Sequence, residues 1–359
     1  MKTGKRKNTA IKWIIGILAA AVAAVLIFIL SIFAIDPMFH YHAPLKFLSY
    51  PLVNERYQNN GIVKHFDYDS IITGTSMTEN FKTSEAQELF GSDFIKVAFS
   101  GGGYIEIGDT LKAAYDSGHD IKYVIWGLDY DKMLYGKNYR NMDNGEIPDY
   151  LYNNNAIDDI KYFFDPIVIR LTGSVVKSTV IGRVPTSFDV YANWNSSYKY
   201  GRDEIMKSCE ISASSSQMQT LTDADRAVVM ENLNENVFSI IESHPETTFY
   251  FFYPPYSIAY WGVQINNGQL DRVLGLEDMV TKELLKYSNV RLYSFRGNSE
   301  LICNLDNYKD VAHYGEWVNS QMLQWMKNDE YRITEENLVE YEKNADDLIK
   351  SYDYDQLFK

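Results

Sequence analysis

The stretch that decides the expected fold reads Asp69-Ser70-Ile71-Ile72-Thr73-Gly74. Its short apolar run is typical of a buried strand, and Gly74 ends that strand in a turn. Residues 83–90 then have the pattern of a helix, with Thr83 or Ser84 as the expected cap. A strand, a turn and a helix form the first half of a βαβ unit, and Ser76 lies in the turn between them.

The same alternation recurs along the chain. Strands are expected at 94–99, 121–126, 247–253 and 289–295, and helices at 104–117, 223–243, 270–287 and 314–326. Five strands with intervening helices predict a mostly parallel five-stranded sheet covered by helices on both faces. We therefore expect an α/β fold, a three-layer α/β/α sandwich.

Two regions depart from this alternation. Residues from about 130 to 215 are rich in Tyr, Asn, Ser and Asp, with only short helical pieces expected, and we interpret them as an insertion in a domain spanning 65–328. The acidic tail, 329–359, has apolar residues at the spacing of one helix face. It either packs on the domain or a partner, or forms a charged, solvated helix.

Candidate chemical groups follow the strands. The carboxyl ends of parallel strands share one edge of the sheet, where ligands bind. Ser76 follows the first strand, Gly101 and Gly102 the second, and Asp129 the third. The pattern Asp310-x-x-His313 lies near the end of the domain.

These residue types suit acyl transfer. A serine hydroxyl needs an imidazole base, and the base needs a carboxylate that fixes its tautomer. The developing oxyanion needs backbone N–H donors, which a glycine-rich turn supplies. Ser76, His313, Asp310 and Gly101 together meet these needs. The alternatives are that Ser76 or Asp310 only caps a helix and that the glycines only form a tight turn.

The chain here resembles the SGNH (GDSL-like) hydrolases. Gly74-Thr75-Ser76 is similar to the block with the nucleophile, Gly101 to the oxyanion glycine, and Asp310-x-x-His313 to the block with the acid and base. The resemblance implies a flavodoxin-like fold over about 65–328. It also implies a serine esterase or acyltransferase that uses no cofactor and no metal.

One position departs from the family pattern. Gly127-Leu128-Asp129-Tyr130 stands where the family has Gly-x-Asn-Asp. The family's Asn donates to the oxyanion, whereas an ionised carboxylate only accepts hydrogen bonds and repels an oxyanion. Either Asp129 is protonated, or it binds a substrate hydroxyl or amine, or another group replaces the Asn, or the site is degenerate.

The N-terminus predicts a membrane anchor. A basic head, residues 1–12, precedes an uncharged run from Trp13 to Ile35 that would extend roughly 34 Å as a helix, enough to cross a bilayer. The positive-inside rule places the head in the cytoplasm and 36–359 outside, with 36–64 as a juxtamembrane linker. The alternative, a cleaved signal peptide, usually has a shorter apolar run.

Composition limits the partners. The net charge of −14 argues against nucleic-acid binding, because an acidic surface repels phosphates. Cys209 and Cys303 form no metal-binding spacing, and whether they form a disulfide depends on geometry that the sequence does not give.

Two functions remain open at this stage. In the first, the chain is an anchored esterase or O-acyltransferase that modifies a cell-envelope polysaccharide or a teichoic acid-like polymer. This role is implied by resemblance to envelope acylation proteins, which also implies a possible membrane acyltransferase partner. In the second, the chain is a catalytically weak glycan-binding or assembly module of a membrane complex, which the Asp129 departure favours.

Overall fold

The computed structural model describes residues 2–143, 145, 147–153, 155–209 and 217–358. Residue 1 of the predicted head, residues 144, 146, 154 and 210–215 of the predicted insertion, and residue 359 of the tail lie outside the described residues. The chain divides into two compact units. The N-terminal unit comprises 1–52, 60–66 and 148–186, and the sheet unit comprises 53–59, 67–147 and 187–359.

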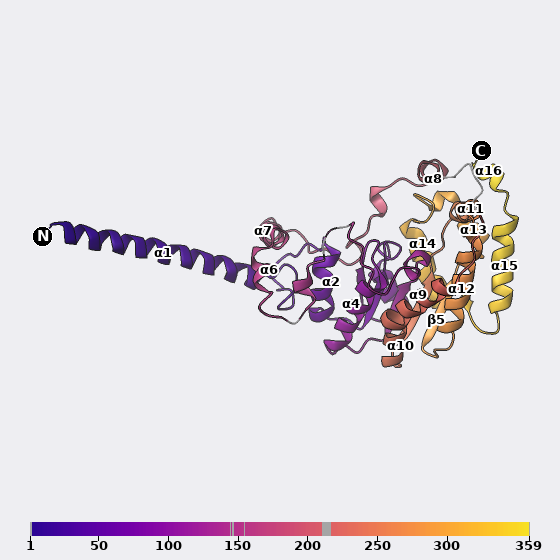
Figure 1. The fold of residues 1–359 in the computed structure, drawn as a ribbon, viewed down its shortest axis with the longest axis horizontal. Coiled ribbons are helices and arrows are strands. Elements are labelled where there is room, and N and C mark those ends of the chain that lie inside the picture. Colours follow the sequence, from indigo (N-terminus) through magenta and orange to yellow (C-terminus); the bar gives the residue numbers. More distant parts are fainter. Residues whose placement is uncertain (1, 144, 146, 154, 210–216, 359) are drawn as a thin grey trace. The chain divides into compact units, whose positions relative to one another are not determined.

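The sheet unit is a mixed α/β structure with a six-stranded, mostly parallel sheet (Figure 1). Its strands are β1 (Ser70–Gly74), β2 (Phe94–Ala98), β3 (Tyr123–Gly127), β4 (Thr248–Tyr253), β5 (Val290–Ser294) and β6 (Arg332–Ile333). The spatial order is β2-β1-β3-β4-β5-β6, and the first five are parallel. The short β6 pairs antiparallel with β5 and was not expected from the sequence, because two residues carry no periodicity.

The helices that connect and flank these strands close to the predicted positions are α3 (Thr83–Phe90), α4 (Tyr104–Asp116), α9 (Asp223–Leu233), α10 (Ser239–Ser243), α12 (Leu270–Leu284) and α14 (Glu316–Lys327). The π-helical turn η3 (Asn234–Phe238) joins α9 to α10, so the predicted helix 223–243 is continuous but locally widened. The tail forms α15 (Leu338–Ser351) and α16 (Tyr354–Phe358).

The remaining helical segments are α2 (Glu55–His65), α5 (Tyr130–Met133), η1 (Asp149–Leu151), α6 (Ile160–Phe164), α7 (Pro166–Val180), η2 (Asn195–Ser197), α8 (Arg202–Ser208), α11 (Ile258–Asn266), α13 (Ser299–Ile302) and η4 (Leu305–Asn307). The 15-residue α7 is longer than the short pieces expected between 130 and 215. Asp165 caps its N-terminus by accepting a hydrogen bond from the Ile167 N–H, and Pro166 suits its first turn.

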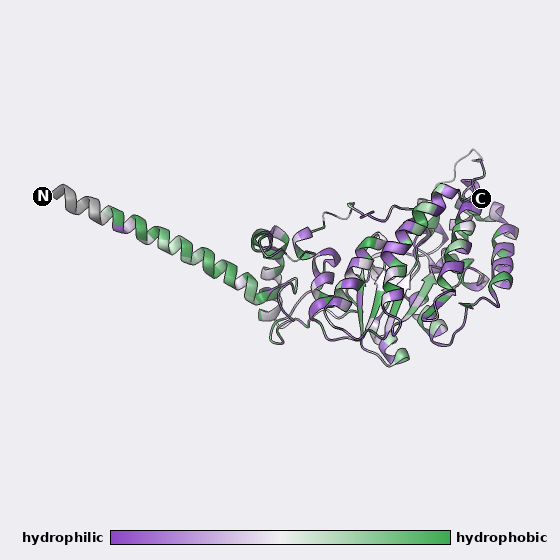
Figure 2. Cartoon of the chain, turned by 60° about the horizontal axis from the view of Figure 1, so that its bottom comes forward, coloured by the Kyte–Doolittle hydropathy of each residue, from purple (hydrophilic) through white to green (hydrophobic). Residues whose placement is uncertain are grey.

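The strands are apolar because both faces of a parallel sheet are covered. Every residue of β1 and β2 is buried, and Figure 2 shows the strands as mainly hydrophobic. The charged residue of these two strands is the buried Lys96 in β2, whose ammonium group donates to the backbone carbonyls of Glu79 and Phe81. Burial lowers the pKa of Lys96 to about 8. Its two bonds fix the backbone shortly after Ser76.

The N-terminal unit contains α1 (Lys2–Ile35), whose segment Ala10–Ile35 is long and apolar enough to cross a membrane. Figure 2 shows this helix as hydrophobic over most of its length. The chain then turns at Asp36, whose carboxylate accepts hydrogen bonds from the N–H groups of His40, Tyr41 and His42. The predicted apolar N-terminal helix is thus present.

A glycine at the end of β1 is required by both conformation and space. Gly74 has φ +143, and an added Cβ would lie 2.7 Å from Thr78 Cγ2. We expect Gly74→Ala to lower the free energy of unfolding by about 2 kcal/mol, because it adds strain and crowding at the turn. The measurement is urea unfolding of the full chain in detergent. Gly136→Ala is the control, since its Cβ would meet nothing within 4 Å. Equal midpoints for the two variants would contradict the expectation.

Candidate functional site

The carboxyl edge of the sheet holds a cavity of about 490 Å³. The strand order changes direction between β1 and β3, and sheets of this kind bind ligands outside such a switch point. The cavity is lined by Ser76 after β1, Gly101 after β2 and Asp129 after β3. His313, from the segment before α14, lines it too. Residues that lie far apart in sequence therefore meet at one edge.

Ser76, His313 and Asp310 form a continuous hydrogen-bonded chain. Ser76 Oγ lies 2.9 Å from His313 Nε2, and His313 Nδ1 lies 2.9 Å from Asp310 Oδ2. With Nδ1 protonated toward the carboxylate, Nε2 is left to accept the hydroxyl proton of Ser76. This is the geometry that activates a serine nucleophile.

The Asp310 carboxylate is fixed by its own turn. Oδ1 accepts hydrogen bonds from the backbone N–H groups of Ala312 (2.9 Å) and His313 (2.8 Å). Burial favours the neutral acid, but these bonds and the His313 ring hold the pKa of Asp310 down at about 2. Asp310 does not cap α14, which begins at Glu316 with Gly315 at its N-cap.

Two backbone donors border the nucleophile. Within the described chain, no group accepts a hydrogen bond from the N–H of Ser76 or of Gly101. Gly101 has φ +62, the left-handed conformation that glycine adopts without strain. Gly102 differs, because its N–H donates to the carbonyl of Phe99 at 2.8 Å. Gly101 therefore lines the cavity beside Ser76 with an N–H that no described group accepts, whereas the Gly102 N–H is used within the turn.

Asp129 is buried at the back of the cavity and held by two hydroxyl groups. Its carboxylate accepts hydrogen bonds from Thr75 Oγ1 (2.7 Å) and from the Tyr256 hydroxyl (2.7 Å). Burial, followed by the charge of Asp131, raises the pKa of Asp129 to about 6. The carboxyl group thus changes protonation state close to neutral pH. At lower pH it is protonated, which is the first alternative given above for Asp129. At higher pH it is a carboxylate that can accept a hydrogen bond from a substrate hydroxyl or amine, which is the second.

Trp194 is a site residue that the sequence did not single out. Its Nε1 donates to the carbonyl of Ser76 at 3.1 Å, and its ring lies edge-on to His313 with centroids 5.6 Å apart. The ammonium of Lys309 lies 4.4 Å from the centre of the Trp194 ring. The only sequence signal was the aromatic content of the predicted insertion, which does not distinguish one aromatic residue from another.

The cavity wall combines polar, aromatic and apolar side chains. Amide, charged and phenol groups come from three helical segments of the sheet unit, namely Lys132, Tyr260, Gln264, Gln269 and Arg272. Apolar side chains share the wall, among them Met77, Leu134, Val273 and Val311, so the cavity offers both hydrogen-bond partners and an apolar surface. Among the residues that the structure describes, no group of His, Cys, Asp or Glu side chains has metal-binding geometry.

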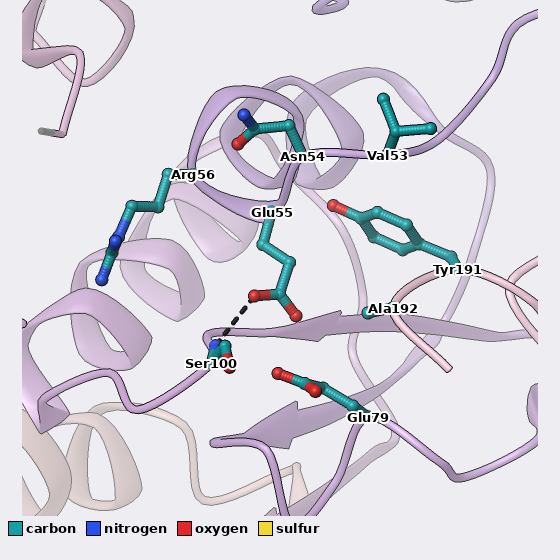
Figure 3. A pocket seen from close by; sticks show the side chains of 8 residues that line it. All are labelled: Val53, Asn54, Glu55, Arg56, Glu79, Ser100, Tyr191 and Ala192. Carbon is teal, nitrogen blue, oxygen red and sulfur yellow. Dashed lines mark hydrogen bonds between the residues drawn. The ribbon is translucent and has the colours of Figure 1, made fainter. Parts of the chain in front are cut away.

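A second cavity, of about 290 Å³, lies beside the Ser100–Gly101 turn (Figure 3). Glu55 and Glu79 point toward each other there, and Glu55 Oε2 accepts a hydrogen bond from the Ser100 N–H at 2.8 Å. Burial raises the pKa of Glu55, and the charge of Glu79 raises it further. Burial also raises the pKa of Glu79. Two buried carboxyl groups that face each other favour the neutral form of at least one of them. The bond from the Ser100 N–H to Glu55 anchors the turn next to Gly101.

The two cysteines do not pair. Cys209 and Cys303 are both free and half-buried, and burial raises the pKa of each thiol. A raised thiol pKa lowers the fraction of reactive thiolate.

Comparison with known proteins adds little to this geometry. No protein-family model matches the chain, and no curated protein matches it in sequence. A solved Streptococcus pneumonia structure, provisionally described as a platelet activating factor, is similar to 77% of this chain and 90% of its own. Its sequence identity is 11% and its TM-score 0.38. The functional argument therefore depends on the site itself.

The Asp310 carboxylate should stabilise the fold in a pH-dependent way. Its folded pKa of about 2 lies below the ordinary 3.8, so its contribution is fully present above about pH 4 and is lost as the pH falls toward 2. We expect Asp310→Asn to lower the free energy of unfolding by about 2 kcal/mol at pH 6 and by less at pH 3. Urea unfolding at several pH values measures this difference. Asp306→Asn, an exposed acid nearby, is the control, and a pH-independent difference for Asp310→Asn would contradict the assignment.

Replacing Asp129 with asparagine should help a reaction that passes through an oxyanion. At pH 8 the Asp129 carboxyl is ionised, whereas an Asn amide supplies a donor. We expect Asp129→Asn to raise ester turnover about tenfold at pH 8, with a smaller gain at pH 5.5, where the acid is mostly protonated. Asp306→Asn is the control, since Asp306 is exposed and does not line the cavity. A loss of turnover in folded Asp129→Asn would show that substrate binding needs the carboxylate.

Proposed function

We propose that the chain is an extracytoplasmic serine esterase or O-acyltransferase of the SGNH type, with Ser76, His313 and Asp310 as its catalytic triad. One observation carries this proposal: the 2.9 Å contact between Ser76 Oγ and His313 Nε2, with Asp310 behind the ring. The three-layer, flavodoxin-like SGNH sandwich is the fold that we assign to the sheet unit. The mostly parallel sheet and the strand order support this assignment.

In the first step, Ser76 Oγ attacks the carbonyl carbon of an acyl ester while His313 Nε2 takes the hydroxyl proton. The N–H groups of Ser76 and Gly101 then stabilise the oxyanion of the tetrahedral intermediate. His313 returns the proton to the leaving alcohol as the ester bond breaks. The product of this step is an acyl-serine, and Asp310 stabilises the imidazolium without itself taking a proton.

In the second step, His313 removes a proton from water or from an acceptor hydroxyl, and the resulting oxygen nucleophile attacks the acyl-serine. The products are the free serine and either a carboxylic acid or a new ester. The polar groups of the cavity wall can bind the hydroxyl groups of an acceptor, and its apolar side chains can hold an acyl group. We propose a cell-envelope polysaccharide or a teichoic acid-like polymer as that acceptor class.

The proposed location follows from the N-terminal helix. If α1 crosses the membrane, the basic residues before it retain the N-terminus in the cytoplasm and place the sheet unit outside. There the enzyme meets envelope polymers, and a membrane acyltransferase partner would supply the acyl group.

A second function is favoured by one specific observation. The buried Asp129 carboxylate accepts two hydroxyl donors beside Ser76, an arrangement that opposes an oxyanion while the acid is ionised. This supports a catalytically weak module that binds a glycan or assembles a membrane complex. The test below distinguishes the two functions.

The test is labelling of the full chain with a fluorophosphonate, together with p-nitrophenyl acetate turnover. We expect one adduct in the native chain and in Ser117→Ala, an exposed serine after α4, and none in Ser76→Ala. Ester turnover should fall about a thousandfold or more in Ser76→Ala.

The outcome decides between the two functions. An adduct that persists in Ser76→Ala would place the nucleophile elsewhere and overturn the triad. A folded native chain with neither adduct nor turnover would favour the binding module.

A further inference from the structure

The N-terminal unit presents a second apolar surface besides α1. Nine large apolar side chains of this unit outside α1 are exposed, most of them on or next to α6 and α7. They are Phe47, Ile157, Ile160, Phe164, Ile169, Val176, Val180, Ile181 and Val184. Single exposed apolar residues are ordinary, but a concentration of this kind marks a binding surface.

The outward face of α7 is itself apolar. Ile169, Gly173, Val176 and Val180 are exposed and follow each other at spacings of four, three and four residues, which places them on one side of the helix. Val168, Leu171, Val175 and Ser178 are buried on the opposite side. An ordinary surface helix has one apolar face and one polar face. The second apolar face of α7 therefore needs a partner.

The charges within α7 are all positive. Asp165, just before it, is its N-cap and accepts hydrogen bonds from the Ile167 N–H and the Tyr150 hydroxyl. The acids before α6, Asp158 and Asp159, lie within ion-pair distance of Lys161 and His40. From residue 166 to 186 the chain contains Arg170, Lys177 and Arg183 and no acidic residue, although the whole chain carries −14. Arg170 and Lys177 are exposed and lie next to the apolar stripe on α7. Apolar side chains flanked by basic ones are typical of helices that lie in the interface of an anionic bilayer.

The position of α6 beside α1 indicates the same partner. The Phe164 ring of α6 packs against the Phe28 ring of α1, with centroids 6.4 Å apart. Phe28 lies about 10 Å along the helix from its end at Ile35, since each residue adds about 1.5 Å. Phe164 is thus level with the last turns of the apolar segment, and Figure 1 shows α6 and α7 next to that end of α1.

The C-terminal end of α7 is tied to the chain that leaves α1. The Ser49 N–H donates to Thr179 Oγ1 at 2.9 Å, and the Thr186 N–H donates to the Tyr50 carbonyl at 3.2 Å. Within the N-terminal unit, α7 is therefore held close to the span and cannot move freely away from it.

We propose that α6 and α7 lie in the outer leaflet of an anionic bilayer beside α1, with Ile169, Val176 and Val180 inserted among the acyl chains. The basic side chains contact lipid phosphates. The N-terminal unit is then a membrane-embedded platform and not a flexible linker. This proposal depends on α1 as a span and is independent of the chemistry at Ser76.

The test uses the full chain in lipid vesicles that contain no other protein and about 30% phosphatidylglycerol. Single cysteines at Val176, Val180 and Val339 are spin-labelled after Cys209→Ser and Cys303→Ser have removed the native thiols. Val339 is 78% exposed on α15 and is the control. We expect collisions with a water-soluble nickel chelate to be about fivefold fewer at 176 and 180 than at 339, and collisions with oxygen to be more frequent.

Equal accessibility at all three positions would show that this face of α7 is in water and would overturn the proposal. A second measurement in the native chain avoids any effect of the cysteine replacements. Vesicles should protect the bond after Arg183 from trypsin in the native chain, and the double variant Val176→Asp, Val180→Asp should be cleaved several-fold faster. Equal cleavage rates would also overturn the proposal.

Discussion

The site depends on one constraint, the parallel alignment of β1, β2 and β3. Because these strands run in the same direction and in register, the turns that follow them open on one edge of the sheet. Ser76, Gly101 and Asp129 each lie two or three residues after the end of a strand. Backbone hydrogen bonding in the sheet therefore sets their mutual positions. His313, Asp310 and Trp194 come from outside this arrangement.

Buried polar groups then fix the turns that the sheet has brought together. Thr75 and Tyr256 hold Asp129, the acid pair Glu55–Glu79 holds the turn before Gly101, and Lys96 holds the backbone after Ser76. Each of these groups is buried from solvent and is held by hydrogen bonds within the protein. The nucleophile therefore sits in a rigid surrounding, which suits a reaction that depends on small distances.

Much of the fold and of the candidate site could be predicted from the sequence. The rest could not, and in each case there is a physical reason. Strands and helices of the sheet unit carry strong periodic signals, and strand ends identify the neighbourhood of Ser76 and the pattern Asp310-x-x-His313. In contrast, β6 is too short for a pattern, and α7 lies in a region whose Tyr, Asn, Ser and Asp content suggested only short helical pieces. Trp194 and the Glu55–Glu79 pair are long-range contacts, which local sequence does not encode.

The bond from Trp194 to the Ser76 carbonyl has a consequence for how this protein can change over time. Trp194 comes from a region of low regularity, where insertions and deletions cost a fold little. Here, however, that region supports the nucleophile from outside the sheet. A loss around position 194 would remove a support that no neighbouring strand replaces. The irregular region is therefore part of the site's architecture, with its own limit on variation.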